Sequence, residues 1–181
     1  MKKTILFLFF VAVTGNLFAQ KKTTTSAIVA FDATTALDNL PKAENKTVIA
    51  ALDMKTGAVQ FEAAVKNFAF SNPMMQDHFN GTKWMNSDEF PKFSFKGNIV
   101  DLSKVNFSID GSYTVDVSGD LTVKDVTKPI TTTGTIAVKG GVVNTSSEFS
   151  IILADYGITG APITAGKVAK EPRITISAEM K

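Results

Sequence analysis

Apolar and polar residues alternate one by one along much of this chain. The clearest run is SYTVDVSGDLTV at 112–123, whose apolar residues are Tyr113, Val115, Val117, Leu121 and Val123. Because successive side chains of a β-strand point to opposite faces, this pattern is typical of strands with one buried and one wet face. Similar runs predict eight or nine strands, at residues 26–33, 47–54, 57–68, 92–100, 104–110, 112–123, 129–138, 147–153 and 173–180.

Short turns separate many of these runs. Lys55-Thr56-Gly57, Asp110-Gly111 and Lys139-Gly140-Gly141 are glycine-containing breaks, which favour antiparallel hairpins. A meander of such strands removes its exposed edges by closing into a barrel. We therefore predict an all-β fold, an antiparallel barrel of eight strands or slightly more. Two segments lie outside the pattern: residues 34–46, expected as a loop or short helix, and residues 155–172, expected as a long connection that could cover a barrel end.

Residues 72–86 interrupt the strand pattern with a short helical insertion. The pair Asn72-Pro73 is a favourable N-cap and first turn for a helix. Met75 and Phe79 are four positions apart and therefore share one helix face, and Trp84 follows in a second short turn. We expect Met75, Phe79 and Trp84 to face inward over one end of the barrel.

The first 19 residues have the features of a secretory signal peptide. Lys2 and Lys3 precede an unbroken apolar run, Ile5–Val13, that is too short to span a membrane. We expect cleavage before Gln20 and export of a soluble protein. The expected organisation is a signal peptide at 1–19, a flexible segment at 20–25 and a single domain at 26–181.

The exported part of the chain carries no net formal charge. The full sequence has 19 basic and 17 acidic residues, and loss of Lys2 and Lys3 leaves 17 of each. Scattered lysines in a neutral chain predict no nucleic-acid partner and no stable insertion into a membrane. Cysteine is absent, so no disulfide holds the fold together.

Candidate catalytic and metal-binding groups are few. The only histidine, His78, lies near Asp77, Asp88 and Glu89, a set that could hold a hard cation weakly but is typical of a solvated surface. A zinc site needs three or four histidine, cysteine or carboxylate ligands. A Ser-His-Asp arrangement is formally possible, but no serine lies in a nucleophile-elbow sequence. The sequence therefore predicts no catalytic residue, no metal site and no cofactor.

The methionine and aromatic side chains of residues 68–85 allow two interpretations. They could fill one end of the barrel as a core plug, or they could form the wall of a cavity for an apolar ligand. An eight-stranded barrel is just wide enough either to fill itself or to hold one small ligand. Methionine suits a ligand of irregular shape. Composition alone favours neither interpretation.

Two segments, in this order, resemble the YceI-like family of bacterial periplasmic proteins. They are MMQDHFNGTKWMNSDEFPKFSFKG at 74–97 and VSGDLTVKDVTKPI at 117–130, and the resemblance runs from about Ser26 to Met180. It implies a lipocalin-like barrel with a long apolar tunnel, and members are described as binding polyisoprenoid chains such as quinone tails. The positions expected to line such a tunnel are Val59, Phe61, Phe70, Met75, Phe79, Trp84, Phe93, Phe95, Ile109, Val115 and Val117.

The resemblance favours a non-enzymatic binding protein, periplasmic or secreted, that is a monomer or a homodimer. Its ligand would be an isoprenoid or quinone-like lipid held for transport, storage or sequestration. Three alternatives stay open at this point: a filled barrel with a structural or interaction role, an enzyme acting on an isoprenoid-like substrate, and an outer-membrane barrel. The last would need aromatic girdles, which two tyrosines and one tryptophan do not provide.

Overall fold

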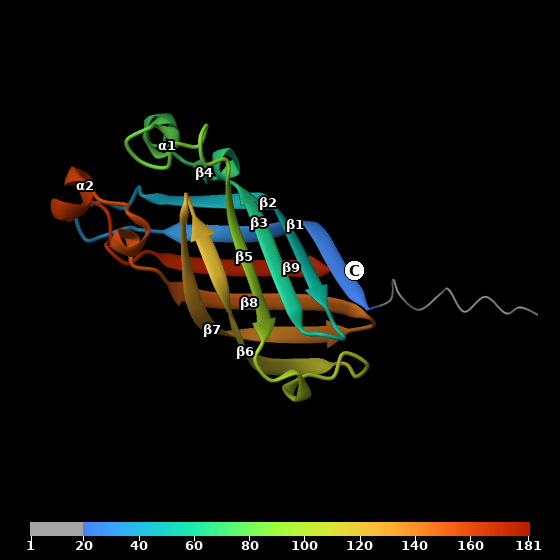
Figure 1. The fold of residues 1–181 in the computed structure, drawn as a ribbon. Helices are drawn as coiled ribbons and strands as arrows, with labels where there is room; N and C mark the ends of the chain where they lie inside the picture. Colours follow the sequence, from blue (N-terminus) through green and yellow to red (C-terminus); the bar gives the residue numbers. More distant parts are fainter. Residues whose placement is uncertain (1–19) are drawn as a thin grey trace, which may run out of the picture.

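Nine β-strands make up most of residues 20–181, the part of the chain that this computed structural model describes (Figure 1). The strands are β1 (Lys21–Asp32), β2 (Lys42–Asp53), β3 (Ala58–Ala64), β4 (Ala69–Phe70), β5 (Lys92–Ile99), β6 (Gly111–Val123), β7 (Val126–Lys139), β8 (Val142–Ser150) and β9 (Arg173–Met180). The helical segments are α1 (Pro73–Asn80), α2 (Ala161–Thr164) and the 3-10 turns η1 (Val65–Asn67), η2 (Leu102–Lys104) and η3 (Leu153–Tyr156). The expected signal peptide at 1–19 lies outside the described residues.

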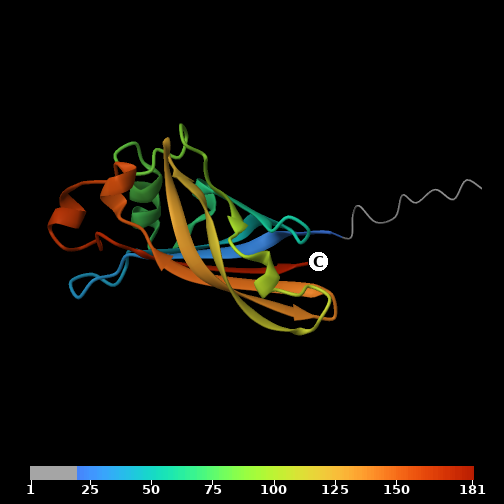
Figure 2. The same ribbon diagram turned by 60° about the horizontal axis from the view of Figure 1, so that its bottom comes forward.

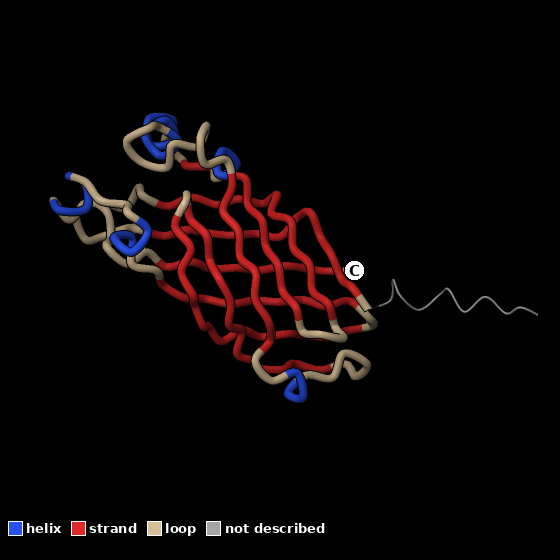
Figure 3. The backbone as a smooth tube through the Cα atoms, viewed as in Figure 1, coloured by secondary structure: helices blue, strands red, loops and turns tan. Residues whose placement is uncertain are grey.

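Eight of these strands close into an antiparallel barrel, as the sequence predicts. They are paired in the order β1-β9-β8-β7-β6-β5-β3-β2, and β1 pairs with β2 to complete the ring. The closing pair runs from Lys21 opposite Asp53 to Asp32 opposite Lys42. Strand β4 adds two residue pairs to β2 outside the ring. The backbone tube shows these strands running side by side at a tilt to one another (Figure 3).

The two α-helices lie at one end of the barrel, and the turn η2 lies at the other. Both α1 and α2 lie beyond the strand ends on the same side in two views of the ribbon (Figures 1 and 2). The insertion expected at 72–86 is α1 followed by a turn at residues 82–85. The long connection expected at 155–172 contains α2 and lies at this same end, which we call the helical end.

A strand expected at 104–110 does not form. Its residues follow η2 in a loop, where the side chain of Asn106 accepts a hydrogen bond from the amide of Ser108 at 2.9 Å. Such a local bond satisfies a backbone group that a neighbouring strand would otherwise have to satisfy. Ile109, which the alternation placed inside the barrel, is 58% exposed, and its carbonyl accepts a hydrogen bond from the Tyr113 hydroxyl.

The N-terminal residues are ordered into a strand, so the prediction of a flexible segment at 20–25 is wrong. Strand β1 begins at Lys21, and residues 21–24 pair with residues 50–53 of β2. The cause is the barrel itself, because β2 would have an open edge here without β1. The run Thr23–Thr25 also suits a strand, since β-branched side chains pack well on a pleated surface.

Strand β2 also begins earlier than expected, within residues 34–46. It starts at Lys42 and contains Asn45, which is fully buried. The Asn45 amide donates to the carbonyl of Ala64 at 2.9 Å, and its side-chain oxygen accepts from the backbone amide of Thr47. These bonds satisfy a polar side chain at a buried position. Because Asn45 interrupts the apolar alternation, the sequence pattern does not indicate where β2 begins.

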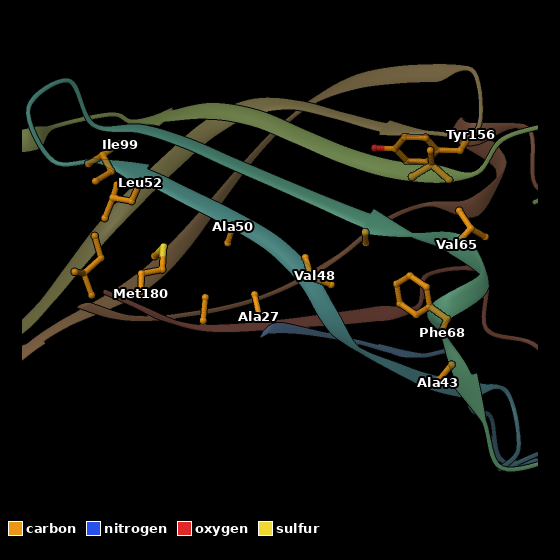
Figure 4. Packing of buried hydrophobic residues seen from close by; sticks show 14 of the residues in the cluster. Ala27, Ala43, Val48, Ala50, Leu52, Val65, Phe68, Ile99, Tyr156 and Met180 are labelled. Atoms are coloured by element: carbon orange, nitrogen blue, oxygen red, sulfur yellow. The ribbon is translucent and has the colours of Figure 1, made fainter. Parts of the chain in front are cut away.

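Buried apolar side chains form one cluster that extends from one end of the barrel to the other. Ile99, Leu52 and Met180 lie together at the end away from the helices, whereas Val65 and Phe68 lie toward the helical end (Figure 4). Val48, Ala50 and Ala27 lie between them and are fully buried as well, so the core runs along the barrel wall. Among residues 20–181, no helix has both the length and the apolar character needed to cross a bilayer.

Candidate ligand-binding cavity

The barrel contains an apolar cavity of about 170 Å³. Side chains from all eight barrel strands line it, because the inward positions of each strand are occupied mainly by valine, isoleucine, leucine and phenylalanine. One ordered water needs roughly 10–15 Å³ and two to four polar partners, so the volume is large enough for many waters but offers them few bonds. The arrangement suits an apolar chain better than water.

Most of the residues predicted to bind ligand line this cavity. They are Val59, Phe61, Phe79, Phe93, Phe95, Val115 and Val117. Three others, Phe70, Met75 and Trp84, line a second hollow of about 210 Å³ at the helical end. Ile109 lines neither, because it lies in the exposed loop before β6.

Phe79 forms part of the wall between the two hollows. It is 6% exposed and lines both of them. Its ring centroid lies 6.4 Å from that of Phe31, 6.0 Å from Phe68 and 4.9 Å from Phe70. Helix α1 positions this ring, and Asn72 caps its N-terminus, where the Asn72 side chain accepts from the backbone amide of Met74 at 2.9 Å.

Met85 takes the inward position that was predicted for Trp84. Met85 is 4% exposed and lines the barrel cavity, whereas Trp84 is partly buried in the outer hollow. The turn after α1 causes this difference, because the amide of Met85 returns to the carbonyl of Phe79 at 3.0 Å. Met75 is likewise partly buried in the outer hollow. Of the three side chains expected to face inward, only Phe79 reaches the barrel cavity.

The residues predicted to bind ligand do not include one side of the cavity wall. Residues of β7, β8 and β9 contribute as much lining as the predicted strands do: Ile130, Ile136, Phe149, Ile174, Ile176 and Met180. The alternation that identified these strands also identifies these positions as inward.

The surface of the cavity is almost wholly apolar, although several serine and threonine residues border it. Thr132, Thr145 and Ser147 line the cavity from the adjacent strands β7 and β8. None of the described residues that line the cavity has an ionisable side chain. His78, Asp38 and Lys167 lie instead around the outer hollow. Within residues 20–181, no three histidine, cysteine or carboxylate side chains are grouped so that they could hold a metal ion.

The closed eight-stranded barrel, the apolar interior and the covered end define a lipocalin-like fold. The family is shown by comparison of the sequence with a family model described as YceI-like domain, which matches residues 10–180. The chain therefore belongs to the YceI-like family, as its two characteristic segments indicated. None of the curated proteins compared with this chain matches it.

Three solved structures from bacteria have a similar fold. A polyisoprenoid-binding domain from Saccharophagus degradans, implicated in plant cell wall breakdown, has a TM-score of 0.76 and 13% identity over 90% of this chain and 98% of its own. Burkholderia cenocepacia BcnA has a TM-score of 0.70 and 18% identity over 86% of this chain and 96% of its own. The Campylobacter jejuni YCEI protein has a TM-score of 0.53 and 15% identity over 79% of this chain and 84% of its own. At such identities the likeness concerns the fold alone.

Proposed function

We propose that this protein binds a long apolar molecule, an isoprenoid or another lipid-like chain, inside its barrel without transforming it. The observation that carries the proposal is the apolar cavity of about 170 Å³ inside the barrel. The Saccharophagus degradans domain of similar fold is described as polyisoprenoid-binding, which supports the same ligand class here. A quinone-like lipid with an isoprenoid tail belongs to this class.

The size of the cavity argues against a filled barrel. An unfilled apolar cavity destabilises a protein by roughly 24 cal/mol per Å³, so about 170 Å³ corresponds to roughly 4 kcal/mol. Domains are typically stable by about 5–15 kcal/mol, so a purely structural barrel would gain much by larger side chains at these positions. A ligand that fills the cavity recovers that free energy, and a binding role therefore explains the open interior.

The chemistry of the lining argues for binding rather than catalysis. General acid–base catalysis needs a titratable side chain within hydrogen-bond reach of the reacting atom. The described lining residues carry hydroxyls but no carboxylate, imidazole or amine. We further propose that the protein acts outside the cytoplasm, in the periplasm or after secretion, where it transports, stores or sequesters its ligand. This part rests on the signal-like sequence of residues 1–19 and on the family.

Organic extraction of the purified protein, followed by mass spectrometry, tests the proposal. We expect a long-chain lipid in near-stoichiometric amount from the natural protein. Val117→Trp would fill the cavity and reduce the extracted lipid at least tenfold, because Val117 lines it. Thr114→Trp is the matched control, since Thr114 lies on the same strand with its side chain exposed. A folded protein that yields no lipid and binds no prenyl chain in titration would refute the proposed function.

A further inference from the structure

The outer hollow leads from the surface of the protein to the ring of Phe79. Its volume is about 210 Å³, and its walls come mainly from the loop before β2, from α1 with the turn after it, and from α2 with the segment that follows. His78, Pro162 and Lys167 border the hollow and are exposed, so one side of it lies at the surface. Phe79 and Pro41 also border it and are buried, so its opposite side lies in the protein interior.

Two phenylalanine rings separate the outer hollow from the barrel cavity. Phe31 and Phe79 border both hollows, and no other described residue does. Their ring centroids lie 6.4 Å apart, and the ring planes are inclined by 49°. Such a distance is typical of aromatic rings in contact, so a chain passes from one hollow to the other only when one of the rings moves aside.

The sheet holds Phe31, whereas a short helix outside the barrel wall holds Phe79. Phe31 lies near the end of β1 and pairs with Ala43 of β2 on one side and with Ile174 of β9 on the other. Every hydrogen bond that the structure shows for α1 goes to residues 70–87. Within the described part of the chain, no such bond joins α1 to one of the eight barrel strands. Phe79 is therefore the ring that can move without breaking a strand pair.

The segment that carries α1 is anchored at its two stems and packed in between. Before the helix, β4 pairs with β2. At the base of the segment the Val65 amide donates to the Pro91 carbonyl at 2.9 Å. Between the stems, the buried side chains of Phe79 and Met85 fasten the segment to the barrel by apolar packing. Fixed stems and a helix held by packing are the arrangement of a lid, whose opening is typically a microsecond-to-millisecond motion.

Side chains of the sheet itself close the opposite end of the barrel. Leu52, Ile99 and Met180 lie together there and are almost fully buried (Figure 4). They belong to β2, β5 and β9, each of which is hydrogen-bonded to a strand on both sides. A passage at this end would need strands to separate, at the cost of backbone hydrogen bonds. At the helical end only the packing of side chains has to yield.

We propose that the outer hollow is the entrance through which an apolar chain reaches the barrel cavity, and that Phe79 is the gate between the two. This inference rests on the proposed function, because it concerns the route of the same ligand. Outward movement of α1 withdraws the Phe79 ring, the chain passes along Phe31, and the return of the helix closes the cavity behind it. Phe70, Met75 and Trp84 give the chain an apolar surface on its way through the outer hollow.

Stopped-flow fluorescence of delipidated protein with 1-aminoanthracene, an apolar fluorescent probe, tests the gate. A minor open conformer is typically populated at about 0.1–10%, and it slows association in proportion to its population. In the natural protein the observed rate should therefore level off at high probe concentration, at the rate of opening. Phe79→Ala should raise the association rate constant at least about tenfold, raise the dissociation rate constant further, and remove the levelling off.

Val143→Ala is the matched control at the opposite end of the barrel. Val143 is fully buried, lies opposite Met180 in the pairing of β8 with β9, and does not border the cavity. Its truncation loosens the packing of the barrel and leaves the entrance untouched, so the association rate constant should stay within about twofold of the natural value. A rise as large as that in Phe79→Ala would reveal a general loosening of the barrel and would overturn the gate.

Val168→Trp keeps the test decisive if Phe79→Ala folds poorly. Val168 is partly buried and borders the outer hollow but not the barrel cavity, so a tryptophan there narrows the entrance and leaves the cavity unchanged. Association and dissociation should both slow by the same factor with an unchanged Kd, because an obstruction on the route acts equally in both directions. Unchanged rates in Val168→Trp would remove the outer hollow from the route.

Val117→Trp establishes where the probe binds. Because this substitution fills the barrel cavity, it should abolish binding. Binding that persists would place the probe in the outer hollow, which would then be a binding site and not an entrance. Failure of the natural protein to bind the probe or any prenyl chain would refute the proposed function as well. Binding with rates that neither Phe79→Ala nor Val168→Trp changes would overturn the gate alone.

Discussion

Replacement of Phe79 by alanine tests whether this ring is a wall of the cavity or only a part of the packing at the helical end. The ring is 6% exposed, lies within 6.4 Å of three other phenylalanine rings by centroid distance and borders both hollows. Its removal would join the cavity of about 170 Å³ to the outer hollow of about 210 Å³.

The expected loss of stability follows from the surroundings of the ring. Truncation of a buried phenylalanine to alanine typically costs about 3–5 kcal/mol. Phe79 already faces open volume on two sides, so it makes fewer contacts than a ring in a filled core. We therefore expect the low end of that range, a fall of about 3 kcal/mol in the free energy of unfolding. Trp84→Ala should cost about 1 kcal/mol, because Trp84 is only partly buried.

Urea denaturation with linear extrapolation measures both free energies, and an unchanged slope would show that the unfolded states are comparable. Met74→Ala is the control on the same helix, since Met74 is 65% exposed and should lose less than about 0.5 kcal/mol. In the folded fraction, Phe79→Ala should also weaken the binding of 1-aminoanthracene, whereas Trp84→Ala should leave binding in the barrel nearly unchanged.

Two outcomes would refute this reasoning. A loss of less than about 1 kcal/mol in Phe79→Ala would contradict its burial among the three rings. A loss near 3 kcal/mol with unchanged probe affinity would make Phe79 a packing residue and place the ligand elsewhere in the barrel.

Two further predictions concern the barrel wall. Gly97→Ala should lower the free energy of unfolding, measured by urea denaturation, by about 1–3 kcal/mol. The cause is that a β-carbon there would lie 2.5 Å from the Ser118 carbonyl oxygen and 2.6 Å from the Phe95 ring. Unchanged stability would contradict this close approach of β5 and β6. Hydrogen bonds from the Thr34 hydroxyl and amide hold the pKa of Asp32 below its ordinary value of 3.8. A lowered pKa stabilises the fold above the pKa of the unfolded chain, and this contribution is lost as pH falls through the folded pKa. The Asp32→Asn variant should therefore be less stable than the natural protein by up to about 1 kcal/mol at neutral pH. This difference in stability should narrow as the pH falls from about 5 to about 2. A difference that does not change with pH would contradict the assignment.

The strands were predictable where one face is consistently apolar. Val115 and Val117 show this well, since their neighbours on β6 are polar and the structure places both residues at the cavity. The same rule failed at residues 104–110, where apolar residues alternate but local hydrogen bonding forms a loop. Alternation of apolar and polar residues indicates that successive side chains differ in burial. A strand is only one backbone conformation that produces this pattern.

The closure of the barrel and the end of the helical insertion depend on contacts between distant residues. Strand β1 is ordered from Lys21 because β2 needs a partner, and no local pattern of the chain contains that requirement. Met85 rather than Trp84 faces the cavity because a turn returns its amide to Phe79. Helical periodicity applies up to Asn80, where α1 ends, and cannot give the direction of side chains beyond it.

The sequence pattern is weakest in the middle of β7. Thr131, Thr132 and Thr133 are consecutive, so the two faces of β7 carry the same residue type and local alternation cannot separate them. The flanking residues nevertheless determine the faces. Ile130 and Ile136 are six positions apart, an even spacing, so a continuous strand must place Thr132 and Gly134 on the same inward face as these two isoleucines. A hydroxyl and a glycine at inward positions between two isoleucines are poor choices for a filled core, and all four residues border the open volume inside the barrel.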